Sequence, residues 1–259
     1  IMLFRRLERA ALKTPVDFLV VGAQKAGTTS FRHYLQQHPQ IGLHAESEPH
    51  FFDDESLFRH GPPDFAAYHK RFPPPRDGLK RGEVTPIYMY WEPAIERIRA
   101  YNPDIRMIAI LRNPIERAYS HWAMESIRSS ESLSFYDALL AERTRPKNYS
   151  RERRVHFYVE RGRYCQQIRR IWQFFDRSQW LVLRSEDLGH DPAGVLKKVC
   201  EFLEIDADAC PHIEPIRLHK GSYIEPMDER SADYLRSVFE EEILELERLL
   251  GWDLAAWLT

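Results

Sequence analysis

Short apolar runs alternate along the chain with longer amphipathic stretches. The segments 17–22, 105–112 and 180–188 each contain at least four consecutive apolar residues, which is typical of buried strands. In the stretches that follow them, apolar residues recur every three or four positions, as on one face of a helix. This alternation predicts an α/β fold in which helices flank a mostly parallel central sheet.

Proline and polar signals bound the predicted helices. Pro114 suits the first turn of a helix, because its fixed φ favours helical geometry and no hydrogen-bond donor is lost there. Asp191-Pro192 precedes another apolar stripe in the same way. The region after His38, with prolines at 62–63 and 73–75, is predicted to be rich in loops. The predicted helices cover 30–37, 92–101, about 114–128, 135–142, 162–175, about 192–203 and about 229–250.

A glycine-bounded turn, GAQKAGTTS, connects the first strand to the first helix. Gly22 and Gly27 are separated by four residues and followed by hydroxyl residues, which matches the outline of a nucleotide-binding phosphate loop. In phosphate-loop NTPases a lysine follows the second glycine, whereas here Lys25 lies inside the turn and Thr28 takes that position. The backbone N–H groups of residues 26–30, the helix dipole and Lys25 together favour a bound anion. The alternative is a turn whose glycines serve only packing.

Arg112 follows the second strand, at the end where open α/β sheets bind ligands. A phosphate-loop NTPase normally has an aspartate near such a strand end to hold magnesium. Arg112, with Ser120 on the next helix, suits a phosphate instead, because a guanidinium binds two phosphate oxygens at once. The alternative is a structural salt bridge at Arg112. Two phosphate sites without evident magnesium ligands point away from ATP and toward 3′-phosphoadenosine 5′-phosphosulfate (PAPS).

The chemistry of sulfuryl transfer is compatible with the absence of magnesium ligands in the sequence. A transferring sulfuryl group carries less negative charge than a phosphoryl group. Cationic side chains and amides therefore suffice to stabilise its transition state, so that no metal is expected. Lys25 is the candidate for the bridging oxygen of the donor.

Composition and charge narrow the function classes. The 259-residue chain is 43% hydrophobic, which allows one sizeable core and makes a single domain spanning 1–259 the simplest organisation. A net charge of −2 argues against nucleic acid as a partner. No run reaches the roughly 18 apolar residues that a membrane span needs. Cys165, Cys200 and Cys210 lack metal or redox spacing and are interpreted as buried thiols in a reducing compartment.

GAQKAGTTS and MIAILRNPIERAYSHW resemble the paired 5′-phosphosulfate and 3′-phosphate motifs of PAPS-dependent sulfotransferases. The resemblance continues in ESEPHFFD (46–53), GEVTPIY (82–88), RGRYCQQI (161–168), the WLVLRSEDL stretch and HKGSYIEPMD (219–228), and so covers nearly the whole chain. It is strongest to the heparan-sulfate type and its bacterial relatives. The resemblance implies a single P-loop-like, three-layer sulfotransferase domain. Its activity is the transfer of a sulfuryl group from PAPS to an acceptor hydroxyl, which leaves adenosine 3′,5′-bisphosphate (PAP).

The resemblance also assigns residues to the donor. Around the 5′-phosphosulfate it places Lys25, Ala26, Gly27, Thr28, Thr29 and Ser30. On the 3′-phosphate it places Arg112 and Ser120. The segment that resembles the family's cofactor-closing loop consists of Lys220, Gly221, Ser222 and Tyr223. Ser222 stands where heparan-sulfate enzymes often have a basic residue.

Removal of the acceptor proton requires a general base. Glu48 matches the carboxylate that has this role in heparan-sulfate enzymes, and His50 is the alternative, as a histidine serves in cytosolic sulfotransferases. If residues 48–52 are extended, both side chains point to the same face. The ordinary interpretation is a solvated Glu48 and a packed His50. Val84 replaces a lysine of the family's EKSxxY or EKTPxY pattern, which suggests that the acceptor is not heparan-like.

The acceptor and the cellular setting stay open. A glycan, a lipid, a metabolite or a carrier-protein-bound acyl chain can each carry the hydroxyl. A basic cluster is interpreted as an ordinary solvated face, with attraction of an anionic acceptor as the alternative; it comprises Arg143, Arg145, Lys147, Arg151, Arg153 and Arg154. Bacterial origin implies the cytoplasm, while an anchor or a larger parent protein outside this sequence remains an alternative. Two other functions stay open: a P-loop kinase or NTPase, and a catalytically silent nucleotide-binding protein.

Overall fold

The computed structural model describes residues 15–209 and 226–258. The chain divides into two compact units. The sheet unit is formed within 1–111 and 171–218, and the helical unit within 112–170 and 219–259.

The sheet unit contains a five-stranded parallel sheet in the order β2-β3-β1-β4-β5. The strands are β1 (Phe18–Gly22), β2 (Ile41–Leu43), β3 (Lys80–Val84), β4 (Arg106–Leu111) and β5 (Trp180–Arg184). Every residue of β1 is buried, because this strand pairs with β3 on one side and β4 on the other. Since all five strands run parallel, the segments that leave their carboxyl ends emerge at one edge of the sheet.

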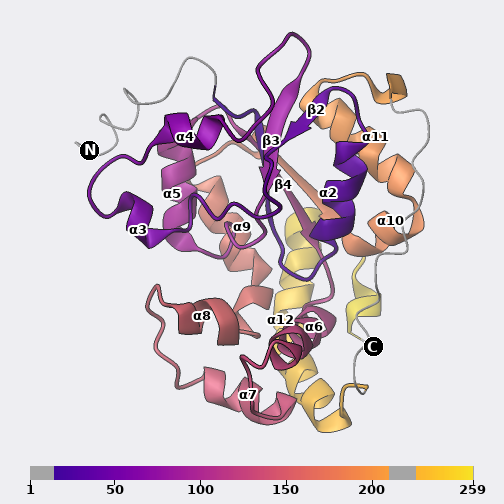
Figure 1. Cartoon of the computed structure of the whole chain (residues 1–259). Coiled ribbons are helices and arrows are strands. Elements are labelled where there is room, and N and C mark those ends of the chain that lie inside the picture. Colours follow the sequence, from indigo (N-terminus) through magenta and orange to yellow (C-terminus); the bar gives the residue numbers. More distant parts are fainter. Residues whose placement is uncertain (1–14, 210–225, 259) are drawn as a thin grey trace. The chain divides into compact units, whose positions relative to one another are not determined.

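Helices cover both faces of this sheet, which confirms the predicted α/β architecture. Figure 1 shows α4 and α5 on one side of the sheet, and α2, α10 and α11 on the other. The helices of the sheet unit are α2 (Thr28–Gln36), α3 (Glu55–Phe58), α4 (Phe65–His69), α5 (Glu92–Tyr101), α10 (Ser185–His190) and α11 (Pro192–Leu203), with short 3₁₀ turns η2 (Arg177–Gln179) and η3 (Ala207–Ala209).

The helical unit is built around α6 (Pro114–Ile127), which contacts α7, α8 and α12. Pro114 is the first residue of α6 and Asn113 caps it by accepting a hydrogen bond of 3.0 Å from the Ile115 N–H, as the proline signal predicted. The other elements are α7 (Phe135–Glu142), α8 (Arg151–His156), η1 (Glu160–Gly162), α12 (Glu229–Leu250) and η4 (Ala255–Trp257). Helix α9 (Tyr164–Trp172) begins in this unit and ends in the sheet unit.

The structure corrects two predictions about the sheet. The strand predicted over 180–188 ends at Arg184, where α10 begins. Strands β2 and β3 lie in the region predicted to be loops. β2 is only three residues long. β3 has the sequence KRGEV, and its charged residues leave no run of apolar residues from which a buried strand could be predicted. β3 nevertheless pairs with β2 on one side and with β1 on the other, and Arg81 and Glu83 of β3 are buried.

Gly82 of β3 lies against the ring of Phe18, its partner in β1. A Cβ at position 82 lies 2.4 Å from two ring carbons of a fully buried phenylalanine, a distance that real contacts do not reach. We therefore expect Gly82→Ala to lower the free energy of unfolding by about 1–3 kcal/mol through overpacking. Thermal denaturation checks this, with Gly189→Ala as the control. No atom lies within 4 Å of a Cβ at Gly189 of α10, so that variant is expected to be neutral or slightly stabilised. An unchanged melting temperature for Gly82→Ala contradicts the packing argument.

Candidate active site

The predicted phosphate loop is a tight turn between β1 and α2. The Ala23 N–H donates to the Ile110 carbonyl of β4 at 2.7 Å, which ties the start of the turn to the sheet. Lys25 and Gly27 both have left-handed backbone conformations, with φ of 70° and 92°. Glycine adopts such a conformation without steric cost, so Gly27 lets the chain reverse directly into α2. The motif therefore forms the strand, turn and helix that its sequence predicted.

The beginning of α2 presents backbone donors. The first intrahelical hydrogen bond runs from the Phe31 N–H to the Gly27 carbonyl at 3.0 Å, so the N–H groups of Thr28, Thr29 and Ser30 have no helical acceptor. Among the described residues, no side chain caps this helix. Gly27 and Thr29 are exposed, whereas Ala26 and Thr28 are buried. With the half-buried Lys25 beside them, these groups can bind an anionic ligand.

Arg112 follows directly on β4 and belongs to the helical unit. Its guanidinium donates to the Glu116 carboxylate at 2.7 and 3.0 Å, and its carbonyl accepts a hydrogen bond of 2.9 Å from the Tyr164 hydroxyl. The salt bridge considered as an alternative for Arg112 is thus present. It is a surface pair, with the Glu116 side chain 56% exposed, and such pairs contribute only about 0.3–0.5 kcal/mol. Ser120 is half-buried on α6.

Glu48, His50 and Asp53 form a chain of polar contacts in the loop after β2. His50 Nε2 lies 3.6 Å from a Glu48 oxygen, and His50 Nδ1 lies 3.1 Å from an oxygen of the fully buried Asp53. The hydrogen bond to Asp53, followed by the one to Glu48, raises the pKa of His50 to about 9. The imidazole is therefore protonated at neutral pH, with one N–H directed to each carboxylate.

The backbone of this loop is not extended throughout 48–52, which was the condition for Glu48 and His50 to point to the same face of a strand. His50 has a φ of 53°, in the left-handed region, so alternation along a strand does not bring Glu48 and His50 together. They meet because the chain turns at His50. Asp53, which orients the ring from three residues on, was missed, although its position on the same loop was a visible signal.

Buried tyrosines hold the loop in place. The N–H groups of Phe51 and Phe52 both donate to the Tyr88 hydroxyl oxygen, at 3.0 and 3.3 Å. The Tyr68 hydroxyl donates to Glu83 at 2.9 Å, and Tyr88 also hydrogen-bonds to Glu83. Burial raises the pKa of Glu83 to about 7. A carboxyl group that sequence analysis treated only as part of a motif thus anchors the segment that carries Glu48 and His50.

Several predicted features lie elsewhere or outside the described residues. Cys210 and the segment Lys220, Gly221, Ser222 and Tyr223 lie outside the described residues. Cys165 and Cys200 are buried free thiols, as predicted. Val84 is buried at the end of β3. No helix in the described part of the chain has the length and apolar character needed to cross a bilayer.

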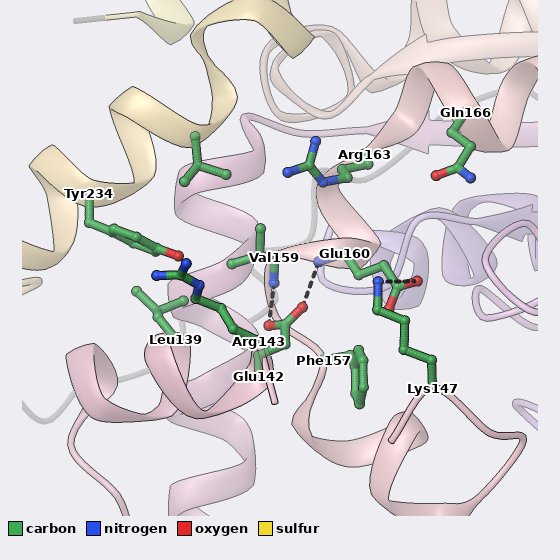
Figure 2. Close-up of a pocket in the computed structure, with 11 residues that line it drawn as sticks. Leu139, Glu142, Arg143, Lys147, Phe157, Val159, Glu160, Arg163, Gln166 and Tyr234 are labelled. Atoms are coloured by element: carbon green, nitrogen blue, oxygen red, sulfur yellow. Dashed lines mark hydrogen bonds and ion pairs between the residues drawn. The ribbon is translucent and has the colours of Figure 1, made fainter. Parts of the chain in front are cut away.

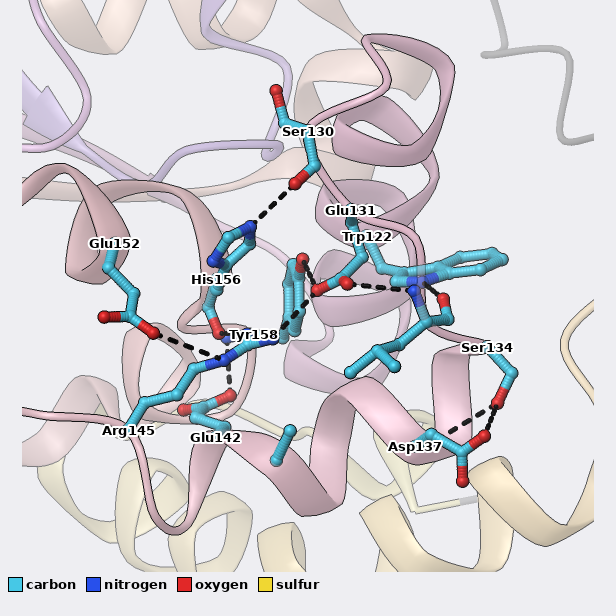
Figure 3. A network of polar contacts seen from close by, with 12 residues as sticks. Trp122, Ser130, Glu131, Ser134, Asp137, Glu142, Arg145, Glu152, His156 and Tyr158 are labelled. Carbon is cyan, nitrogen blue, oxygen red and sulfur yellow. Dashed lines mark hydrogen bonds and ion pairs between the residues drawn. The ribbon is translucent and has the colours of Figure 1, made fainter.

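Two of the six residues of the predicted basic cluster have a structural role. Figure 3 shows Arg145 between two segments of the helical unit, where it donates to the His156 carbonyl at 2.8 Å and to Glu131 at 3.2 Å. Glu131 also accepts a hydrogen bond of 3.0 Å from the Tyr158 hydroxyl. Arg153 is 3% exposed and pairs with Glu160 at 3.3 Å. Arg153 is thus a buried ion-pair partner and Arg145 a half-buried one, so the expectation of a solvated face is wrong for these two arginines.

Comparisons with known proteins agree with this arrangement. Residues 15–242 match the family model described as "Sulfotransferase domain". Heparan sulfate glucosamine 3-O-sulfotransferase 6 of Homo sapiens is 32% identical over 185 residues, which cover 71% of this chain and 51% of that protein. Bifunctional heparan sulfate N-deacetylase/N-sulfotransferase 4 of Mus musculus is 29% identical over 93% of this chain and 31% of that protein.

A solved structure extends the likeness to the whole fold. The sulfotransferase from Alicyclobacillus acidocaldarius superposes with a TM-score of 0.79 at 28% identity, over 96% of this chain and all of that one. The chain spans about half the length of the 3-O-sulfotransferase that it matches. Because the family model covers well over half of the sequence, the chain belongs to the sulfotransferase domain family, with the P-loop-like α/β fold that its sequence predicted.

Proposed function

We propose that the chain is an enzyme that transfers a sulfuryl group from PAPS to an acceptor hydroxyl. The observation that carries this proposal is the turn before α2, where Lys25 lies among backbone N–H groups that no described side chain caps. Family membership supports the same donor. Attack by the acceptor oxygen forms a new O–S bond, the S–O bond to the 5′-phosphate breaks, and PAP leaves.

The residues of the turn are proposed to bind the 5′-phosphosulfate. Lys25 stabilises the negative charge that develops on the bridging oxygen, and the N–H groups at the beginning of α2 bind the phosphate oxygens. The same loop residues were implied by the family resemblance: Lys25, Ala26, Gly27, Thr28, Thr29 and Ser30. Arg112 and Ser120 are proposed for the 3′-phosphate, and Lys220, Gly221, Ser222 and Tyr223 for closure over the donor.

Glu48 is proposed as the general base, in preference to His50. A base must accept the acceptor proton, and a histidine with a pKa near 9 already carries its proton at neutral pH. The His50 imidazolium instead positions Glu48 by directing its Nε2–H toward a carboxylate oxygen 3.6 Å away. Asp53 fixes the ring from the other side. The three side chains therefore divide into a base, Glu48, and two positioning residues.

The acceptor is proposed to be a hydroxyl group on a glycan. The relative of Homo sapiens is named for transfer to a glucosamine oxygen, whereas the relative of Mus musculus is named for an N-sulfotransferase, so an amino-sugar nitrogen is the second candidate. A carrier-protein-bound hydroxyl has no support of this kind. No metal is proposed for the transfer, because a lysine and backbone amides supply positive charge at the turn.

A transfer assay with ³⁵S-labelled PAPS tests the function. The acceptor panel contains an N-acetylated glycosaminoglycan backbone, its N-deacetylated form and a neutral chitin oligosaccharide, each with EDTA present. We expect label in the N-acetylated acceptor, where only oxygens are available. Label only in the deacetylated acceptor favours nitrogen as the acceptor atom, and no transfer to any acceptor together with no PAP binding contradicts the proposal.

Glu116 is expected to compete weakly with the donor for Arg112. Since the surface pair is worth about 0.3–0.5 kcal/mol, Glu116→Gln should tighten PAP binding by about twofold. Arg112→Ala removes a charge-assisted contact and should weaken PAP binding by about 10–100-fold. Calorimetric titration of both variants with PAP measures these changes. Equal PAP affinity in wild type and Arg112→Ala contradicts the assignment of Arg112 to a phosphate.

The other functions considered from sequence have less support. A P-loop kinase or NTPase is disfavoured because the family model and the similar proteins are sulfotransferases. A catalytically silent nucleotide-binding protein does not account for a carboxylate, an imidazolium and a buried aspartate arranged in series.

A further inference from the structure

A pocket of about 380 Å³ opens in the helical unit, lined by side chains from α7, α9, α12 and the segments around residues 147 and 157–160. Its volume lies at the lower end of the range for small-ligand sites. Figure 2 shows Arg143 extending toward Tyr234 of α12, with Arg163 on the other side of Val159. None of these residues has a role in the PAPS or base chemistry proposed above, although Arg143 and Lys147 belong to the basic cluster whose alternative interpretation was attraction of an anionic acceptor.

The backbone donors of this pocket are already occupied. The carboxylate of Glu142, itself 7% exposed, accepts hydrogen bonds from three consecutive N–H groups, those of Tyr158, Val159 and Glu160, at 2.6–2.8 Å. Consecutive N–H groups of this kind otherwise bind small anions such as phosphate. Because Glu142 fills this position, recognition of a ligand in the pocket falls to side chains.

The cationic side chains of the pocket are available for a ligand. Arg143 and Arg163 are both exposed, and neither guanidinium has an ion-pair partner among the described residues. Lys147 differs, because it lies 3.9 Å from Glu160, which also pairs with Arg153. Two uncompensated guanidinium groups at the rim suit carboxylate or sulfate groups, each of which can accept two N–H bonds.

Aromatic and amide groups lie beside these cations. Tyr234 packs edge-to-face against Tyr136, with ring centroids 6.1 Å apart, and the Arg230 guanidinium lies 3.7 Å from the Tyr136 centroid. Tyr234 is thereby held in place as a half-buried ring in the pocket wall, and Gln166 adds an exposed amide. The C–H face of a sugar packs on such a ring, while its hydroxyl groups bond to amide and guanidinium groups.

We infer that this pocket binds an anionic saccharide unit, with Arg143 and Arg163 on its carboxylate or sulfate groups and Tyr234 against its ring. This rests on the proposed function and deepens it, since the glycan proposed there as acceptor is then one that carries acidic groups. A nucleotide or free phosphate fits less well, since the backbone N–H groups that would hold it are bonded to Glu142. Exposed arginines instead suit the repeated, salt-sensitive contacts that polyanions make.

Oligosaccharide binding to the full chain tests the inference. The probe is a sulfated glycosaminoglycan octasaccharide, titrated at two salt concentrations into wild type and the double variant Arg143→Ala/Arg163→Ala. We expect at least about a tenfold loss of affinity at low salt, and a smaller dependence of affinity on salt in the variant. Arg151→Ala is the matched control, because Arg151 is an exposed arginine of the same segment that does not line the pocket. It is expected to bind like wild type.

Further arms separate the possible failures. Tyr234→Leu should also weaken octasaccharide binding. If the two arginines only attracted anions to the surface, replacing this aromatic ring would have no effect. PAP affinity should be unchanged in all these variants; if wild type binds no PAP, the proposed function fails independently of the pocket. Octasaccharide affinity that is equal in wild type and double variant overturns the inference, and so does inorganic sulfate that displaces the octasaccharide at a similar concentration.

Discussion

Replacing Lys25 by alanine is expected to lower the sulfuryl transfer rate by about 10²–10³-fold, the usual cost of removing one preorganised charge-stabilising donor. Lys25 is half-buried in the turn between β1 and α2. Its ammonium group is proposed to stabilise the bridging oxygen as the S–O bond breaks, and water does not replace a fixed cation there at equal strength. The rate constant for ³⁵S transfer under saturating PAPS and acceptor measures the effect.

The fold should survive this change. Lys25 has a φ of 70°, and alanine at the same position experiences the same backbone preference, so the conformational cost does not increase. Lys197→Ala is the matched control, because Lys197 is an exposed lysine of α11 in the same unit. It should transfer sulfuryl groups at the wild-type rate. A Lys25→Ala variant that melts like wild type and retains near-normal turnover removes Lys25 from the mechanism.

Replacing Glu48 by glutamine is expected to lower the transfer rate by about 10²–10⁴-fold, the range that general base catalysis contributes. Glutamine keeps the size of the side chain but cannot accept the acceptor proton. PAP affinity should stay unchanged, because Glu48 is assigned to the acceptor side of the reaction. His50→Gln should cost less than Glu48→Gln, since it removes only the group that positions the base. A larger loss for His50→Gln than for Glu48→Gln reverses the two roles.

The pH dependence separates the two residues independently. The pKa of His50 is raised to about 9, so loss of its Nε2 proton above that pH removes the donor to Glu48 while Nδ1 stays bonded to Asp53. We expect the transfer rate to fall as the pH rises through about 9, and Asp53→Asn to move this fall to lower pH. If His50 were the base, the rate would increase over the same range.

The contribution of His50 to folding stability is expected to fall with rising pH, in the same direction as the transfer rate. A histidine whose folded pKa lies above its unfolded value of about 6.5 stabilises the fold fully below that pH, and the contribution is lost as the pH rises through about 9. The side chain of His50 is 46% exposed, so solvent screening keeps this contribution small.

Strong local signals account for the part of the fold that sequence predicted. The apolar core of β4 and the proline at the beginning of α6 are each specified within a few residues, and α5, α7 and α12 occupy the predicted ranges. β3 is specified by its neighbours instead. Its charged residues become buried because β1 and β2 pair with it and because Glu83 hydrogen-bonds to Tyr68, fifteen positions away. No window of the sequence contains that information.

The same distinction applies to the site. Lys25 and the glycines of its turn form a contiguous motif, and the structure has the strand, turn and helix that the motif predicted. The sequence suggested only that Glu48 and His50 share a face if residues 48–52 are extended, whereas their contact depends on the left-handed conformation of His50. The role of Tyr88 was missed because it arises from tertiary hydrogen bonds, whereas Asp53 lies only three residues from His50 and was overlooked. The hydrogen bonds to Asp53 and Glu48 also determine the protonation of His50, which sequence alone does not fix.

Calorimetric titration with PAP, compared with ATP and 5′-AMP in the presence of EDTA, tests the central claim most directly. The account predicts that PAP binds tightly without metal and that 5′-AMP, which lacks the 3′-phosphate, binds much more weakly. ATP should not displace PAP. A preference for ATP that develops only when magnesium is restored would contradict the account and assign the turn around Lys25 to phosphoryl chemistry.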